Sequence, residues 1–161
     1  MVLKLKEEVG MHGHFKIFGR YSPKDSWKLL VEQDNLIVST GREFLRDKLS
    51  GSDTTNYLKS FAVGTGTTNP SISNVDLESA VAYSGTDVYK AFEEYVEEDY
   101  RSVTYVGYLS SLEPSTTTDI TEIGLFTATG VSGDIMVCRA TFDAITKTTA
   151  LELRVEYLLE I

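Results

Sequence analysis

One candidate for phosphate-binding chemistry is the glycine-rich run Gly64-Thr-Gly-Thr-Thr. A phosphate-binding loop ends in Gly-Lys-Ser/Thr ahead of a helix, so that backbone amides and a lysine meet the phosphate together. This run lacks that ending, and the chain contains no Gly-x-Gly-x-x-Gly. We therefore interpret the run as a structured turn and expect no nucleotide cofactor.

Two histidines, His12 and His14, could bind a metal ion. Residues two apart in a strand share a face, so both imidazoles could reach one ion. Two ligands do not complete a site, however, and the chain has no third histidine and only one cysteine, Cys138, far away in sequence. The spacing indicates a surface pair rather than a metal centre.

Five acidic residues lie close together in the middle of the chain: Glu93, Glu94, Glu97, Glu98 and Asp99. They could offer oxygen ligands to calcium, but they lack the alternating Asp/Asn spacing and the turn glycine of a calcium loop. Runs of like charge usually stay in water. We expect a solvated acidic rim or one that faces an interface.

Catalysis has little support in the residue pattern. A serine or cysteine nucleophile would need His12 or His14 as its base, and no Gly-x-Ser-x-Gly elbow occurs. A sandwich could bring two carboxylates together for glycoside hydrolysis, but no pair is singled out. We expect no catalytic residues and a protein that is not an enzyme.

Four tyrosines gather around one predicted hairpin and are the candidate interface residues: Tyr95, Tyr100, Tyr105 and Tyr108. Tyrosine suits positions where an apolar ring is buried and the hydroxyl stays wet, as at protein interfaces. Three interpretations of these four tyrosines remain open: their rings cover the core of their own sheet, form a subunit interface, or stack against a sugar.

The clearest element that could position such residues is the C-terminal segment, residues 151–161. Leu153, Val155 and Tyr157 alternate with Glu152, Arg154 and Glu156, and only Leu158 breaks the polar face. Alternation with period two indicates an antiparallel strand with one buried face. Because this strand would tie the C-terminus into a sheet, we expect its truncation to unfold the protein.

The other predicted elements are mostly short strands. One helix is predicted over residues 40–50, from the Thr40-x-x-Glu43 capping-box spacing at its start and Gly51 at its C-cap. The segment 88–98 fits a helix by spacing and a strand by aromatic content, and we assign it to a strand. Further strands are predicted at 14–18, 27–32, 58–63, 103–109, 120–126 and 135–142.

About seven strands and one helix predict a mainly β protein, an antiparallel β-sandwich or barrel-like domain with one short α-helix. We expect residues 1–161 to form a single domain. Within it, residues 1–34 would form an N-terminal hairpin or attachment segment, residues 40–50 the helix, and residues 58–161 the main sheets. The length of 161 residues is enough for a sizeable core.

The net charge, the apolar runs and the cysteine count limit which partners and which cell compartment suit this chain. The formal net charge of −9 makes nucleic acid a poor partner, because phosphates are neutralised by Lys and Arg. No stretch approaches a membrane span, and the N-terminus has no apolar run of signal-sequence length. The lone Cys138 excludes an internal disulfide, and we expect it to be buried on one strand face with Met136, Ala140 and Phe142.

Four sequence blocks resemble a family of small tailed-bacteriophage virion structural proteins, usually labelled tail-fibre-like or tail-collar-like. The blocks are residues 35–42 (NLIVSTGR), 61–71 (FAVGTGTTNPS), 120–126 (ITEIGLF) and 139–148 (RATFDAITKT). The resemblance implies a β-rich virion component without catalysis, made in the host cytoplasm and assembled into the virion. The chain departs from the simplest members in its longer N-terminal segment, residues 1–34, and in the acidic stretch 93–99.

We expect from this resemblance a structural role on the tail, as a fibre, collar or baseplate-associated component. Virion positions are symmetric, so the expected partners are other copies of the chain, as a homo-oligomer and most simply a trimer, together with other virion proteins. Two alternatives remain open. One is a capsid decoration protein on the head surface, and the other is a carbohydrate-binding module that recognises a host surface glycan.

Overall fold

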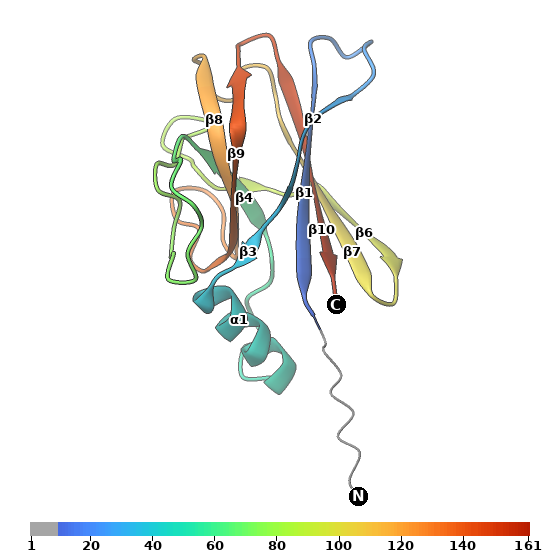
Figure 1. The fold of residues 1–161 in the computed structure, drawn as a ribbon, viewed down its shortest axis with the longest axis vertical. Helices are drawn as coiled ribbons and strands as arrows, with labels where there is room; N and C mark the ends of the chain where they lie inside the picture. The colour runs from blue at the N-terminus through green and yellow to red at the C-terminus, as the bar shows by residue number, and fades with distance from the viewer. Residues whose placement is uncertain (1–9) are drawn as a thin grey trace, which may run out of the picture.

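The computed structural model describes residues 10–161, which form ten strands and one helix (Figure 1). The helix is α1 (Ser39–Ser50). The strands are β1 (His12–Arg20), β2 (Lys28–Asp34), β3 (Leu36–Ile37), β4 (Ser60–Gly64), β5 (Lys90–Ala91), β6 (Glu94–Asp99), β7 (Ser102–Leu109), β8 (Thr118–Phe126), β9 (Met136–Lys147) and β10 (Glu152–Glu160).

The strands form two antiparallel sheets that pack against each other. The first sheet has the order β2-β1-β10-β7-β6 and the second has the order β3-β9-β8-β4-β5. Their facing sides enclose the main core, which includes Phe15, Val155 and Tyr157 from the first sheet and Ile123 and Leu125 from the second. The prediction of a mainly β, sandwich-type fold with one short helix is confirmed.

The C-terminal strand β10 lies at the centre of the first sheet, between β1 and β7. Leu153, Val155 and Tyr157 are buried, and the polar residues between them lie on the opposite face. The alternation therefore predicted both the strand and its buried side. The backbone amide of Ile161 also donates to the carbonyl of Arg101, at 2.8 Å, which ties the last residue to the β6–β7 turn.

The N-terminal hairpin is an integral part of the first sheet. Strand β1 pairs with β10 along its whole length, from His12 opposite Glu160 to Arg20 opposite Glu152. The boundary that placed the main sheets in residues 58–161 was therefore wrong, because β1 and β2 supply two of the five strands of the first sheet. Of the expected attachment segment, residues 1–9 lie outside the described part of the chain.

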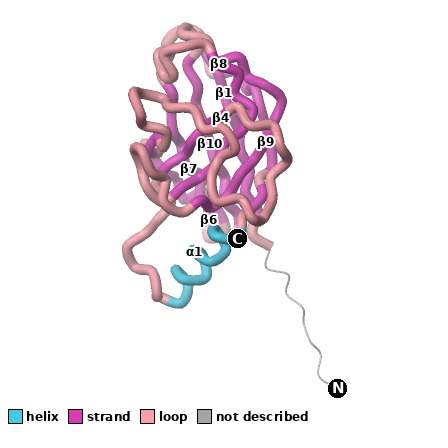
Figure 2. Tube along the Cα trace, turned by 90° about the vertical axis from the view of Figure 1, so that its left-hand side faces the viewer, coloured by secondary structure: helices cyan, strands magenta, loops and turns pink. Residues whose placement is uncertain are grey.

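The second sheet is buried on both faces. The connection between β4 and β5, residues 65–89, covers its outer side and appears as the green loop on the far side of β4 and β8 from the first sheet (Figure 1). Figure 2 views the molecule from this side, with loops crossing in front of the strands. A second small core lies beneath the loop and contains Val38, Ala62, Leu77, Tyr89, Phe126 and Met136.

The helix α1 lies at one end of the sandwich (Figure 1). Its C-cap was predicted correctly, since Gly51 is left-handed with φ 74°. The predicted capping box was wrong: the N-cap is Val38, and no side chain caps the helix. The hydroxyl of Thr40 instead donates to the backbone carbonyl of Met136, at 2.7 Å, so a contact with β9 takes the place of a local cap.

Cys138 is fully buried in the main core, as expected. Ala140 shares that core, but Met136 lies in the second small core on the other side of the sheet. The pairing of β8 with β9 shifts register between Leu125 and Phe126, and such a bulge breaks the strict alternation of faces. No helix within residues 10–161 has the length and apolar character needed to cross a membrane.

Candidate functional site

The structure brings together two of the four candidate tyrosines. Tyr95 on β6 is directly opposite Tyr105 on β7, with ring centroids 6.3 Å apart. Tyr100 lies in the turn between these strands and is 91% exposed. Tyr108 packs against Trp27, with centroids 6.0 Å apart. Because Tyr105 and Tyr108 are an odd number of residues apart on one strand, their side chains point to opposite faces of the sheet.

Tyr105 links the surface to the core. Its ring is 5.4 Å from Phe92 and 6.5 Å from the buried Tyr157, measured between centroids. Burial, and then the neighbouring Tyr95, raise the pKa of the Tyr105 hydroxyl. Tyr95, at the outer end of this aromatic series, is 67% exposed. Tyr105 therefore contributes mainly to packing, and Tyr95 offers a ring to the outside.

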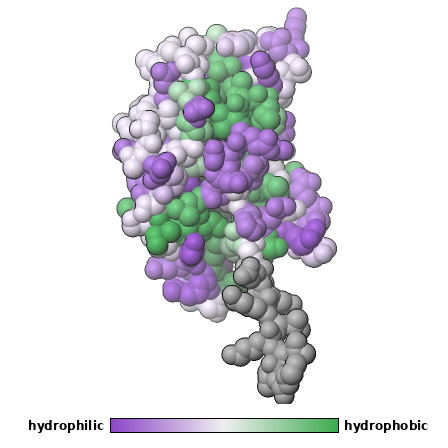
Figure 3. Space-filling view, in the orientation of Figure 1, coloured by the Kyte–Doolittle hydropathy of each residue, from purple (hydrophilic) through white to green (hydrophobic). Residues whose placement is uncertain are grey.

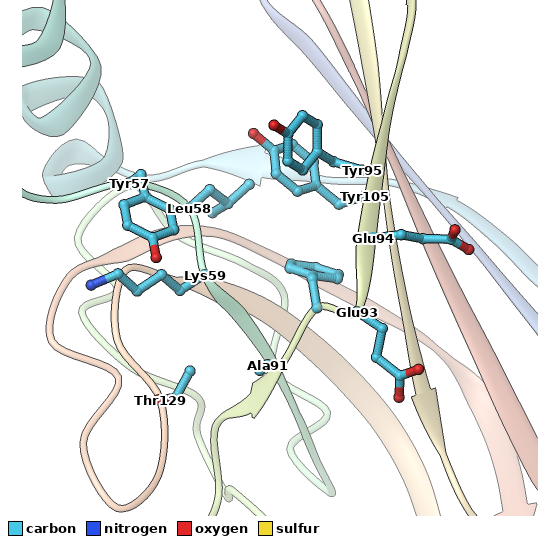
Figure 4. A pocket seen from close by; sticks show the side chains of 10 residues that line it. Tyr57, Leu58, Lys59, Ala91, Glu93, Glu94, Tyr95, Tyr105 and Thr129 are labelled. Carbon is cyan, nitrogen blue, oxygen red and sulfur yellow. The ribbon is translucent and has the colours of Figure 1, made fainter.

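A groove of about 890 Å³ opens beside these rings, between the start of β4 and the start of β6. In Figure 4, Tyr57 and Lys59 lie on one side and Tyr95 and Tyr105 on the other. Tyr57 is 62% exposed, and its ring centroid is 4.6 Å from the ammonium nitrogen of Lys59. Tyr57 was not among the predicted site residues, although it stands immediately before the predicted strand 58–63.

The groove can bind a ligand by stacking and by charge. Its rings offer flat apolar faces, and tyrosine hydroxyls and the Lys59 ammonium offer polar contacts. The carboxylates of Glu93 and Glu94 point away from the hollow (Figure 4). Lys59 also lines the groove, with its ammonium against the Tyr57 ring, and the arrangement suits binding.

The acidic stretch lies on strand β6, at one edge of the first sheet. All six residues from Glu94 to Asp99 are exposed. The β6–β7 hairpin projects at the right of Figure 1 and forms a mainly hydrophilic projection in Figure 3. Asp99 holds its turn, accepting hydrogen bonds from the Arg101 amide at 2.7 Å and the Ser102 hydroxyl at 3.0 Å. The backbone bond from Arg101 contributes most to the lowered pKa of Asp99.

The strand assignment for residues 88–98 is confirmed, with a break in the middle. Residues Lys90–Ala91 pair with β4 in the second sheet, whereas Glu94–Asp99 pair with β7 in the first. The chain thus crosses between the sheets at Phe92 and Glu93. The hairpin turn falls at Tyr100 and Arg101.

The glycine-rich run binds an internal carboxylate. The amide of Gly66 donates to Oε1 of the buried Glu122 at 3.0 Å, and the Gly66 carbonyl accepts from the Thr121 hydroxyl at 2.8 Å. A Cβ at Gly64 or Gly66 would lie within 3 Å of the Glu122 side chain. The glycines therefore allow the backbone to approach Glu122 closely.

The two histidines, His12 and His14, lie in different environments. His14 lies between two carboxylates of β2, with Nδ1 2.6 Å from Asp34 and Nε2 2.9 Å from Glu32. His12 is exposed. Within residues 10–161, no group of three or more His, Cys, Asp or Glu side chains is arranged to hold a metal ion.

Comparison of the chain with models of protein families, with curated proteins and with solved structures finds no match. Its function is therefore inferred from its own residues and geometry.

Proposed function

We propose that this chain is a non-enzymatic structural protein of a tailed-bacteriophage particle, placed on the tail as a fibre, collar or baseplate-associated component. The observation that carries an assembly role is strand β6, an exposed sheet edge on a projecting hairpin. An exposed edge presents unpaired amides and carbonyls and is a ready template for another chain. The virion assignment itself rests on the four sequence blocks.

The expected assembly is a homo-oligomer, a trimer in its simplest form, that also contacts other virion proteins. Exposed apolar groups on the projecting hairpin support this, since Tyr95, Val96 and Tyr100 are all available for contacts. Aromatic residues are favoured in the centres of protein interfaces. Light scattering after gel filtration measures the oligomer directly, and a strict monomer at high concentration would contradict self-association in solution.

Immunogold electron microscopy of parent particles tests the location. Antibody against this chain should label the tail or its tip. Label over the head would replace the tail assignment with capsid decoration. Intact, accessible particles without label would contradict the virion role.

A second candidate function, recognition of a host surface glycan, is favoured by the groove between Tyr57 and Tyr95. Exposed rings beside polar groups suit the apolar faces and hydroxyls of a sugar. A glycan array with the wild-type chain and a Tyr57→Ala, Tyr95→Ala variant tests it. Binding lost in the variant supports the groove, and a Tyr21→Ala variant, altered at an exposed ring in the β1–β2 connection, is the matched control.

A further inference from the structure

We propose that a second pocket, separate from the groove of Tyr57 and Tyr95, binds the ring of an uncharged sugar. It has a volume of about 680 Å³ and shares only Glu93 with that groove. The inference rests on the second candidate function, glycan recognition, and gives it a site of its own. We call this site the Trp27 pocket; the side chains that carry the argument are Arg20, Trp27, Lys90, Tyr108, Glu113 and Glu152.

Two aromatic rings supply the apolar surface of the Trp27 pocket. Trp27, in the β1–β2 connection, is 6.0 Å from Tyr108 of β7, measured between ring centroids. Both residues are half-buried, so they keep surface that faces solvent. The Arg20 guanidinium lies 4.2 Å from the centroid of the Trp27 ring and helps to hold it in place. The C–H groups on one face of a sugar ring can pack against such surface, while its hydroxyls remain free for hydrogen bonds.

Two ion pairs supply oriented polar groups. Nε of Arg20 is 2.7 Å from Oε2 of Glu152, and Nζ of Lys90 is 2.9 and 3.0 Å from the two carboxylate oxygens of Glu113. These four side chains are only 21–24% exposed. Each charged group is therefore held by its partner before a ligand arrives, and binding loses little further side-chain freedom.

The Arg20–Glu152 pair keeps unused bonding capacity. Within residues 10–161, Nη2 of Arg20 donates no hydrogen bond and Oε1 of Glu152 accepts none. A guanidinium N–H next to a carboxylate oxygen presents a donor and an acceptor side by side. Two neighbouring sugar hydroxyls match this arrangement, because a hydroxyl can both donate and accept.

The charges of the pocket favour an uncharged ligand. Its two lining cations, Arg20 and Lys90, are already paired with carboxylates, and a third lining carboxylate, Glu93, is exposed. Lys147 is fully buried nearby and donates to two backbone carbonyls, both at 2.9 Å. A phosphate or a sugar carboxylate would therefore compete with existing ion pairs and approach Glu93, which repels it.

A nuclear magnetic resonance titration of the isotope-labelled, full-length chain tests the site. The ligands are glucose, galactose and mannose, each compared with its uronic acid. The chain has one tryptophan, so its indole N–H signal is unambiguous. At least one neutral sugar should shift that signal and the backbone amide of Ser110, which donates to Glu113. The corresponding uronic acid should bind more weakly by about tenfold or more.

Variants of the aromatic surface test the contact, with the Ser110 amide as the readout. Trp27→Ala should weaken binding of the neutral sugar by about tenfold or more, and Trp27→Phe, which keeps a ring, should retain part of the affinity. Tyr21→Ala is the matched control, because this exposed ring belongs to the same connection but does not line the pocket. Circular dichroism checks that each variant is folded.

A charge variant tests the ligand class. Glu93→Gln removes the exposed carboxylate and should strengthen binding of the uronic acid by about threefold or more, with little effect on the neutral sugar. Glu43→Gln, which removes an exposed carboxylate on α1, should change neither affinity. Equal effects of Glu93→Gln on both sugars would contradict the charge argument.

The outcomes distinguish the Trp27 pocket from the groove. If none of these sugars shifts the Trp27 and Ser110 signals, the inference is overturned, and a uronic acid that binds as tightly as its neutral counterpart also overturns it. Shifts confined to the groove and abolished by Tyr57→Ala, Tyr95→Ala would overturn the Trp27 pocket but support glycan recognition at the groove. Gold label on the tail would support the virion role in each case.

Discussion

The Arg139 guanidinium binds the Glu122 carboxylate with Nε 2.8 Å from Oε2, and both side chains are withdrawn from water. The two oxygens of Glu122 also accept hydrogen bonds from the backbone amides of Gly66, Glu78 and Ser79, at 3.0, 3.1 and 2.8 Å. One ion pair of the second sheet therefore anchors the start and the middle of the loop that covers it.

Arg139→Met should lower the free energy of unfolding by about 3–5 kcal/mol, because it leaves the Glu122 carboxylate buried without its cation. Urea unfolding followed by circular dichroism measures the loss. Arg46→Met is the matched control, since Arg46 pairs with Asp47 at the surface and such pairs contribute about 0–1 kcal/mol. Equal losses in the two variants would show that the buried pair does not hold the loop.

Gly41→Ala should destabilise the protein although it places a better helix former in α1. An added Cβ would lie 2.7 Å from the carbonyl carbon of Val137, and this backbone cannot rotate aside. Such overpacking costs about 1–3 kcal/mol, against about 1 kcal/mol gained in helix propensity. A thermal melt that rises for Gly41→Ala would contradict the close approach; Glu43→Ala, at an exposed helix position, should change little.

His14 should make stability depend on pH. Partial burial lowers its pKa, but the hydrogen bonds with Asp34 and then Glu32 outweigh burial, so the pKa lies above its ordinary 6.5. Charged His14 therefore stabilises the fold. This stabilisation is fully present below about pH 6.5 and is lost as the pH rises through the folded-state pKa.

His14→Gln should flatten the pH profile of unfolding free energy in that window, whereas His12→Gln, at an exposed position, should leave it unchanged. Urea titrations at a series of pH values give both profiles, and the imidazole proton shifts in nuclear magnetic resonance give the His14 pKa directly. A value below 6.5 would contradict the arrangement.

Cys138 should be inert in the folded protein. Burial raises the pKa of its thiol to about 12, and the thiolate is the reactive form. A thiol reagent at neutral pH should modify it more than about a hundredfold slower than an exposed cysteine introduced by Ser73→Cys. In denaturant the two should react alike; rapid labelling of native Cys138 would show that this core opens readily.

Predictions from the sequence failed where a side chain contacts residues distant in the sequence instead of the nearby residues that a local rule suggests. The Thr40-x-x-Glu43 spacing satisfies a local capping rule, yet Thr40 bonds to Met136, 96 positions away. The four tyrosines were grouped by closeness in sequence, but strand alternation turns Tyr108 away from Tyr105. Tyr57, which borders the groove opposite Tyr95, carries no local signal that it meets β6.

The sequence by itself determined the local elements, because alternation along β10 and the left-handed preference of Gly51 depend only on neighbouring residues. It also determined that Cys138 would be buried. Only the tertiary structure decided that β1 and β7 flank β10, that Glu122 meets Arg139, and that Tyr57 and Tyr95 border one groove. Those relationships join residues far apart in the chain, and packing of the whole sandwich selects them.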